Sequence, residues 1–337
     1  MNRIIYKTNT SILSFTLLCI ILVGALSTSI SASTTYQLTL TKGTDEFVVD
    51  LYNDTNWKTT VDPSLTPSDW FEGEANVTNA KSKITLKGWT SNTWGMYDVL
   101  ISIFMPEFFS FEEILTLEFL LDSNGYNEAY INSSYTSDYD LWYGLRAVWN
   151  YTTNDYEENP SNKDILDMYF IPKSLRLQAG IIILQNPLDF KTMLDDYNAL
   201  ATELNGNFAI QISGYSFPNI SADDFLWQLA LGGLVIAGPQ TDYLESLVSE
   251  LGCENASVSG STLTLQRYGV TNYTVEVSYG EKGMMSSFTV KDLGGAVIYQ
   301  ITSSNSEWLF YLILIIVAVC SVAIIAFLII RKKKLKR

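Results

Sequence analysis

The sequence predicts an α+β protein, in which a large antiparallel β-sheet, curved or split, has helices packed on one face and is followed by one C-terminal transmembrane helix. Three observations predict it. Segments with β character come first along the chain, and segments with helical spacing follow at about residues 186–252. Four alternating segments then predict an antiparallel meander at about residues 262–302, ahead of an uncharged run at residues 308–330.

Residues 1–33 have the pattern of a secretory signal peptide. Arg3 and Lys7 precede an apolar stretch from Ile12 to Leu26, and the small residues STSISAS follow. Fifteen apolar residues are few for a membrane span, which favours cleavage between Ser27 and Ser33 over the alternative of an uncleaved signal anchor.

The next part of the chain is predicted mainly as strands. The run YDVLISIFMP at residues 97–106 is apolar, contains β-branched residues and ends in proline, so we expect a buried strand there. The run FEEILTLEFLLDSNG at residues 111–125 fits a helix or a strand, and a helix is the preferred prediction. The other segments predicted as strands are Tyr36–Thr41, Glu46–Tyr52, Lys83–Trp89, Leu141–Tyr151 and Ala179–Leu184.

Three helices are predicted within residues 186–252. Asn186 and Pro187 supply an N-cap and a first-turn proline for the first helix. Ser221 begins the second as a capping box and leads into an uncharged helix from Phe225 to Gly238. The third runs from about Gln240 to Leu251 and ends at Gly252.

The uncharged helix is the first candidate for a binding surface. It is too short to span a bilayer, so it is either a buried core helix or one wall of an apolar cavity. The residues proposed to contact an apolar ligand are Phe225, Trp227, Leu229 and Leu231.

The C-terminal part predicts the meander and then a membrane anchor. Tyr273, Val275, Val277 and Tyr279 alternate with polar residues, as in a half-buried strand. The uncharged run at residues 308–330 makes a helix roughly 34 Å long, enough for a hydrocarbon core of about 30 Å. The cations that follow it, and that orient the span, are Arg331, Lys332, Lys333, Lys334, Lys336 and Arg337.

This charge asymmetry predicts a single-pass protein of the plasma membrane. Cytoplasmic flanks of membrane helices are enriched in Lys and Arg, which places the C-terminus inside. We therefore expect an extracellular α+β domain at residues 34–307, a membrane helix at 308–330 and a basic cytoplasmic tail at 331–337.

The charge of the outer domain excludes nucleic acid as its partner. Two of the 21 Lys and Arg residues lie in the signal segment and six in the tail, so thirteen remain against all 36 Asp and Glu. A domain with a formal charge near −23 lacks the basic face that phosphate backbones require.

Seven N-x-S/T sequons lie in the predicted outer domain and suit a glycosylated surface protein. In a chain rich in Asn, Ser and Thr, chance would supply several of them. The candidate acceptors are Asn53, Asn76, Asn132, Asn150, Asn219, Asn255 and Asn272.

Catalytic chemistry is limited by composition, and no enzyme is predicted. The chain contains no histidine, which removes the usual general base and the histidine-activated Ser or Cys nucleophiles. Cys253 is accordingly predicted to be a small buried residue. Neighbouring carboxylates leave a carboxylate-based hydrolase as one alternative: Glu112–Glu113, Glu157–Glu158, Asp195–Asp196 and Asp223–Asp224. No cofactor is predicted, and a hard-cation site, for example for calcium, is left open without a location.

Two parts of the chain carry a resemblance to known proteins. The ending AIIAFLIIRKKKLKR, together with TVEVSYGEKGMMSSFTVKDLGGAVIYQITSS at residues 274–304, resembles uncharacterised archaeal type I surface proteins. Those proteins have a signal peptide, a sequon-rich outer domain and one C-terminal helix with a basic tail, and the resemblance implies no activity. The predicted architecture is also similar to lipoprotein-carrier folds, in which a curved antiparallel sheet holds lipid under helices.

These observations favour a non-enzymatic, membrane-anchored surface protein whose outer domain binds an envelope protein, a glycan or a lipid. The first alternative is a carrier of apolar ligands with a cavity under the helix from Phe225 to Gly238. The second alternative is the carboxylate-based hydrolase.

Overall fold

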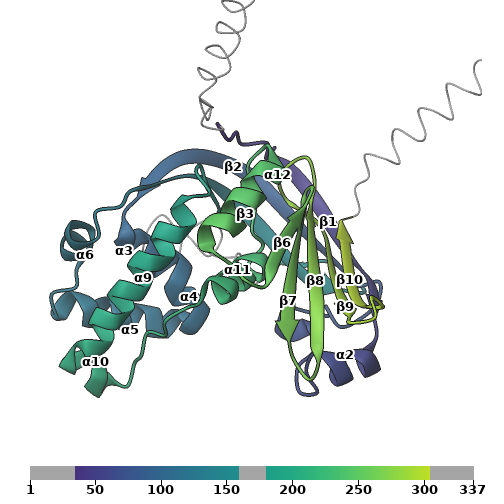
Figure 1. The fold of residues 1–337 in the computed structure, drawn as a ribbon, viewed down its shortest axis with the longest axis horizontal. Helices are drawn as coiled ribbons and strands as arrows, with labels where there is room; N and C mark the ends of the chain where they lie inside the picture. Colours follow the sequence, from purple (N-terminus) through teal and green to yellow (C-terminus); the bar gives the residue numbers. More distant parts are fainter. Residues whose placement is uncertain (1–34, 159–179, 304–337) are drawn as a thin grey trace, which may run out of the picture. The chain divides into compact units, whose positions relative to one another are not determined.

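A ten-stranded antiparallel sheet organises the protein (Figure 1). The computed structural model describes residues 35–158 and 180–303. The strand order is β4-β3-β2-β1-β10-β9-β8-β7-β6, with β5 paired to β3. The strands are β1 Gly43–Tyr52, β2 Lys81–Trp94, β3 Tyr139–Thr152, β4 Glu157–Glu158, β5 Gly180–Leu184, β6 Ala256–Ser259, β7 Thr262–Tyr268, β8 Asn272–Tyr279, β9 Met285–Asp292 and β10 Val297–Ser303.

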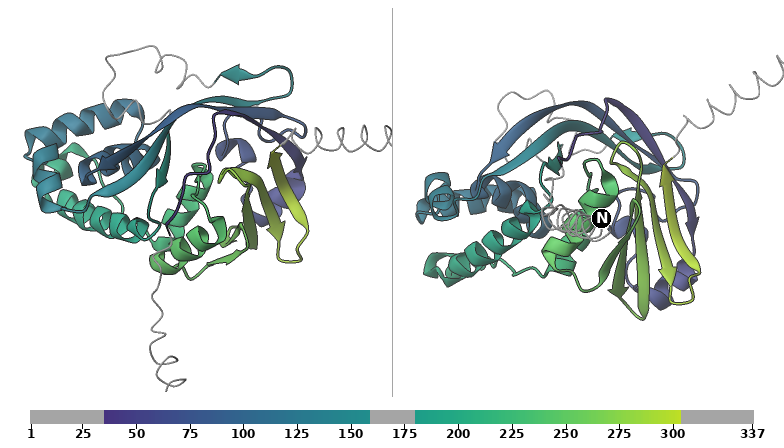
Figure 2. Two further views of the ribbon diagram at one scale, coloured as in Figure 1. Left: turned by 90° about the horizontal axis from the view of Figure 1, so that it is seen from above. Right: turned by 45° about the horizontal axis from the view of Figure 1, so that its top comes forward.

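The central pair β1–β10 joins the two halves of the sheet. Val49 pairs with Ile301 in this antiparallel register, and both side chains are fully buried. The long strands β2 and β3 pair from Lys81–Thr152 to Trp94–Tyr139, with irregularities on either side of Ser82 and Lys87. Such bulges bend a strand, and Figure 2 shows these two strands arching over the helices.

Helices pack on the concave side of this sheet. Figure 2 shows α11 and α12 within the curve of the strands. The Phe104 ring stacks on Tyr197 with centroids 3.9 Å apart and lies 5.3 Å from Phe225, which joins three helical segments in one core. The helical elements are α2 Asp54–Thr60, η1 Pro67–Asp69, α3 Met96–Val99, η2 Leu100–Phe104, α4 Met105–Phe108, α5 Phe111–Ser123, α6 Glu128–Ser134, α9 Asp189–Gly206, α10 Phe208–Ser213, α11 Ala222–Leu231 and α12 Gln240–Leu251.

The α+β class and the large antiparallel sheet are confirmed. The four meander strands appear as β7 to β10, and the third predicted helix is α12, which ends at Gly252 as expected. The segment at residues 111–125 is the helix α5, begun by a capping box between Ser110 and Glu113. Ser221 also caps α11, because its Oγ accepts a hydrogen bond from the Asp224 backbone N–H at 3.1 Å.

The prediction of a strand at residues 97–106 is wrong. This segment forms α3, η2 and α4 in succession, and Val99, Leu100, Phe104 and Met105 are buried. A short apolar run without alternation fits a buried strand and a buried helix equally well, so its partners decide its form. The predicted strand at Tyr36–Thr41 is likewise absent, apart from one bridge between Gln37 and Gly238.

The uncharged helix is shorter than predicted. Helix α11 ends at Leu231, and Gly233 then adopts a φ of 79°, a left-handed conformation that an α-helix does not continue through. Residues 234–237 form neither a helix nor a strand, and the Ile236 N–H donates to the Gly283 carbonyl at 2.9 Å. Residues 234–237, all of them buried, therefore belong to the core but not to a helix.

The predicted signal segment, membrane helix and tail lie outside the described residues. Within residues 35–158 and 180–303, no helix is both long and apolar enough to cross a bilayer.

Candidate functional site

Two neighbouring cavities lie between the sheet and α11. The larger cavity has a volume of about 470 Å³, and its apolar wall includes Phe104, Ile181, Leu184, Phe190, Phe225 and Leu229. The smaller cavity has a volume of about 270 Å³, and its apolar wall includes Phe47, Trp70, Ile84, Val148, Leu231 and Met285. Both are partly open to solvent.

The two cavities meet at a small set of shared residues. Glu72, Arg146, Gly232 and Gly233 line both of them. Arg146 comes from β3, where it pairs with Leu86 of β2. A Cβ atom at Gly233 would lie 3.8 Å from Nη1 of Arg146, so the guanidinium lies directly against the turn that ends α11.

The Arg146 guanidinium has no partner of opposite charge in the described parts of the chain. No ion pair there involves it, and its Nε is buried without a hydrogen-bond acceptor. Burial lowers the pKa of Arg146, but a guanidinium keeps its proton at neutral pH in proteins, so the side chain is charged. The negative end of the α11 dipole favours a cation at this place but supplies no hydrogen bond to Nε.

Unpartnered polar atoms concentrate at these cavities. Six buried side-chain nitrogen or oxygen atoms lack a hydrogen-bond partner within the described ranges. Four of the six belong to cavity-lining residues: Ser102 Oγ, Arg146 Nε, Asn150 Oδ1 and Gln228 Oε1. Buried polar atoms in folded proteins are nearly always hydrogen-bonded, so their concentration here indicates a place for the polar part of a ligand.

Two carboxylates also lie on the larger cavity. Glu72 and Glu107 line it, and both side chains are exposed overall. Neighbouring protein atoms nevertheless desolvate the Glu107 carboxyl, which raises its pKa. Glu107 therefore marks a partly dehydrated stretch of the cavity wall.

Three of the four proposed apolar-ligand residues line a cavity. Phe225 and Leu229 lie on the larger one and Leu231 on the smaller one. Trp227 lines neither; its ring packs edge-to-face on Trp70 with centroids 5.1 Å apart, and the Arg267 guanidinium lies 5.0 Å from its centre. Trp227 thus packs α11 against Trp70 and against Arg267 of β7.

The polar residues of the site were not predicted from the sequence. Ser102, Arg146 and Gln228 come from three separate elements, and no motif joins them. One signal was available: Arg146 is the only charged residue in the otherwise apolar and aromatic run LWYGLRAVWNY.

Five of the eight neighbouring carboxylates proposed for a hydrolase make other contacts. Asp196 accepts a hydrogen bond from Tyr139 Oη at 2.8 Å, and Asp223 accepts one from Asn255 Nδ2 at 3.0 Å. The remaining contacts are those of Glu113 with Ser110, of Asp195 with Lys191, and of Asp224 with Ser221 and Arg267. Glu112 and Glu157 line neither cavity.

Metal and thiol chemistry find no support in the described residues. No group of three or more Asp, Glu, Cys or His side chains there is placed to hold a metal ion. Cys253 is partly buried. Desolvation, and to a smaller extent the negative charge of the nearby Asp223, raises the pKa of its thiol to about 12. The thiol is therefore protonated at neutral pH and a poor nucleophile.

The sequon asparagines differ in accessibility. Asn53, Asn219, Asn255 and Asn272 are exposed, while Asn76 and Asn132 are partly buried. Asn150 lines the smaller cavity and its Oδ1 is buried, which makes it the poorest acceptor for a glycan.

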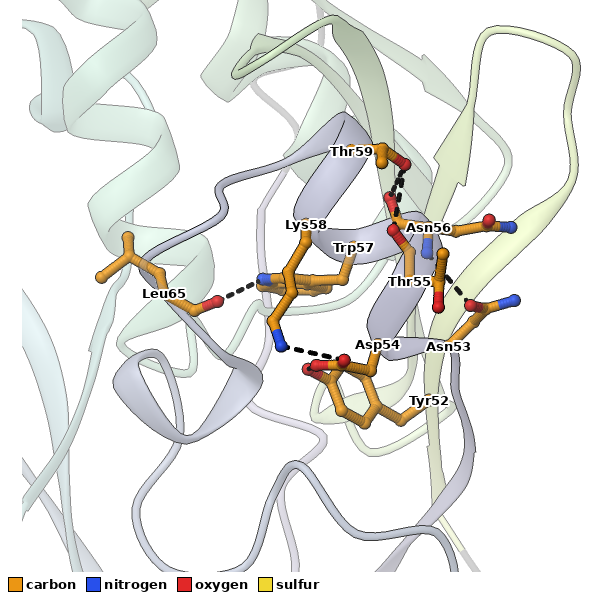
Figure 3. Close-up of polar contacts among 9 residues, drawn as sticks. All are labelled: Tyr52, Asn53, Asp54, Thr55, Asn56, Trp57, Lys58, Thr59 and Leu65. Carbon is orange, nitrogen blue, oxygen red and sulfur yellow. Dashed lines mark hydrogen bonds and ion pairs between the residues drawn. The ribbon is translucent and has the colours of Figure 1, made fainter.

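Asn53 combines a sequon with a structural role (Figure 3). It is the N-cap of α2, and its Oδ1 accepts a hydrogen bond from the Asn56 backbone N–H at 3.0 Å. A glycan would be attached through Nδ2, so the capping oxygen stays available.

Comparison of the chain with protein-family models, with curated proteins and with solved structures finds no match.

Proposed function

We propose that this is a membrane-anchored cell-surface protein whose outer domain, without catalysing a reaction, binds an apolar or amphipathic ligand in the two cavities. The observation that carries the proposal is the pair of cavities on the concave side of the sheet, with α11 as a common wall. The surface location rests on the predicted signal peptide, membrane helix and basic tail.

The physical case for an apolar ligand is the lining of the cavities. Small-molecule sites typically occupy about 300 to 1,000 Å³ and combine apolar walls with a few polar groups. The larger cavity, about 470 Å³, falls in this range, and the smaller one adjoins it. Each methylene group that a ligand transfers from water to such a wall contributes about 0.8 kcal/mol. A lipid therefore suits the site better than a glycan or an envelope protein does.

A test of this proposal is native mass spectrometry of the full-length protein, purified in a non-ionic detergent from membranes of a glycosylating host. We expect a retained lipid-sized ligand in the wild type and its loss from the variant Leu229→Asp, which places a charge on the larger cavity. Leu293→Asp is the matched control, because Leu293 is 73% exposed and lies outside both cavities. Lipids bound to the membrane helix are common to all three proteins, so they cancel in the comparison.

The proposal is overturned if Leu229→Asp, folded by circular dichroism, retains the same ligand at the same occupancy as the wild type. A wild type that carries and takes up no lipid would also contradict it. Either result would instead favour a surface protein whose outer domain binds an envelope protein or a glycan.

A carboxylate-based hydrolase is the second candidate, favoured by one observation. Glu72 and Glu107 line the same cavity, and Glu107 has the raised pKa that a general acid needs. For this function, Glu107→Gln and Glu72→Gln would each abolish turnover of a glycoside or an ester while leaving binding intact. Unchanged turnover in both variants would exclude the pair.

A further inference from the structure

The two cavities share one cation at their junction, and this geometry limits the kind of ligand. We infer that the ligand is an amphiphile with one anionic head group and two apolar chains, with the head on Arg146 and one chain in each cavity. The inference rests on the proposed function, because it specifies the ligand of the same site.

The sign of the head group follows from Arg146. Its guanidinium lies on both cavities, is desolvated and has no carboxylate partner among the residues that the structure describes. An unpaired buried charge is costly, and an oxyanion is the partner that removes this cost. The planar guanidinium donates two parallel hydrogen bonds to a phosphate or a carboxylate, which a neutral head group cannot match.

Polar atoms on either side of the junction fit the rest of the head group. Ser102 Oγ and Gln228 Oε1 belong to residues of the larger cavity, and Asn150 Oδ1 belongs to the smaller one. They are suited to the ester or hydroxyl groups from which two chains diverge. Glu72 also lines this junction, and its side chain is exposed.

Room for the head group comes from the turn after α11. Gly232 and Gly233 present no side chain toward the junction, and the Cβ position of Gly233 lies 3.8 Å from Arg146 Nη1. A side chain at position 233 would contact the Arg146 guanidinium and take up room at the junction. The two apolar walls then diverge, one toward Phe190 and Phe225 and the other toward Phe47 and Met285.

The test measures the preference of the full-length protein for lipids that differ in one feature at a time. The probes are dioleoyl phosphatidylglycerol, dioleoylglycerol with the same two chains and no phosphate, single-chain oleoyl lysophosphatidylglycerol, and oleate. Native mass spectrometry of delipidated protein with added probe gives occupancy and affinity. The variants are Arg146→Met, Arg146→Lys and the control Arg267→Met, which removes a cation that lies outside both cavities.

We expect the wild type to bind one phosphatidylglycerol at this site at least about tenfold more tightly than dioleoylglycerol or the single-chain lipid. Arg146→Met loses this preference, Arg146→Lys keeps part of it, and Arg267→Met keeps all of it. If oleate binds as two molecules and displaces phosphatidylglycerol at equal concentration, the head is a carboxylate on separate chains and the two-chain inference is wrong.

Failure of the inference and failure of the proposed function are distinguishable. Suppose that Arg146→Met and Arg146→Lys both keep the wild-type preference for phosphatidylglycerol, while Leu229→Asp binds no lipid. The inference about the head group is then wrong, and the proposal that the cavities bind lipid is supported. If Leu229→Asp also binds lipid as the wild type does, the inference and the proposed function are both wrong.

Discussion

At the residue scale, Glu107 and Glu113 have pKa values displaced in opposite directions. Desolvation raises the pKa of Glu107 on the cavity wall. Hydrogen bonds from the Ser110 hydroxyl and backbone N–H, each 2.7 Å long, lower the pKa of Glu113 at the start of α5. The ionised form is therefore disfavoured by folding in Glu107 and favoured by it in Glu113.

This difference predicts opposite pH dependences of stability. The Glu107 contribution is fully present below the ordinary value of 4.5 and is lost as pH rises through the raised pKa of the folded state. The Glu113 contribution is present above 4.5 and is lost as pH falls through its lowered pKa. Urea unfolding from pH 3 to 7 should show that Glu107→Gln gains stability over the wild type as pH rises, while Glu113→Gln loses it. Parallel curves for the two variants would contradict these assignments.

A second residue-scale prediction separates the two roles of Asn53. Asn53→Ala removes both the sequon and the N-cap, and should lower the free energy of unfolding by about 1 kcal/mol. Thr55→Ala removes the sequon and keeps the capping oxygen, so it should remove a glycan without that loss. Intact-mass measurement and urea unfolding of protein from a glycosylating host give both quantities. A mass difference between the wild type and Thr55→Ala no larger than that of the substitution itself would mean that this sequon is not used.

At the element scale, the buried segment at residues 234–238, after α11, depends on a close backbone contact. Gly283 has a φ of 77°, and a Cβ atom there would lie 1.9 Å from the Ile236 carbonyl oxygen. The backbone N–H of Ile236 also donates a hydrogen bond to the Gly283 carbonyl oxygen at 2.9 Å. This pairing fixes residues 234–238 beside the loop between β8 and β9, and so fixes the end of the cavity wall.

The contact predicts a difference between two glycine substitutions. Gly283→Ala and Gly295→Ala both place alanine at positive φ, which costs roughly 1 kcal/mol. Only Gly283→Ala also displaces the Ile236 backbone, since the Cβ position of Gly295 has no atom within 4 Å. We expect Gly283→Ala to lose at least about 1 kcal/mol more in unfolding free energy than Gly295→Ala. Equal losses of unfolding free energy in the two variants would show that the backbone at Ile236 moves away from a Cβ atom at little cost.

Local signals predicted two helix ends correctly and one wrongly, because α9 begins at Asp189 with Leu188 as its N-cap and not with Asn186. Ser221 and Gly252 mark helix ends through chemistry contained within a few residues, and both ends were predicted. The segment at residues 97–106 failed because it is buried without a polar side to reveal its period. The predicted helix from Phe225 is too long because the uncharged run continues through Gly232–Gly233, whereas Gly233 adopts a positive φ.

At the scale of the whole molecule, the predicted topology can be tested on cells. Protease added to intact cells should degrade a tag in the outer domain and spare a tag after Arg337. Replacing Lys332, Lys333 and Lys334 by Gln should expose the C-terminal tag in part of the population. Replacing Lys42, Lys81 and Lys87 of the outer domain removes equal charge and should change nothing. An exposed C-terminal tag in the wild type would reverse the orientation.

The sequence by itself determined the class of protein: an α+β domain, its four-stranded C-terminal meander, and the signals that predict its place at a membrane surface. These features depend on composition and on patterns within one segment, and both can be read from the sequence without knowing which segments are in contact. Only the tertiary structure decided where the candidate site lies. Arg146, Ser102 and Gln228 meet only because β3, η2 and α11 converge under a bent sheet, and contacts between distant segments leave no periodicity in any one of them.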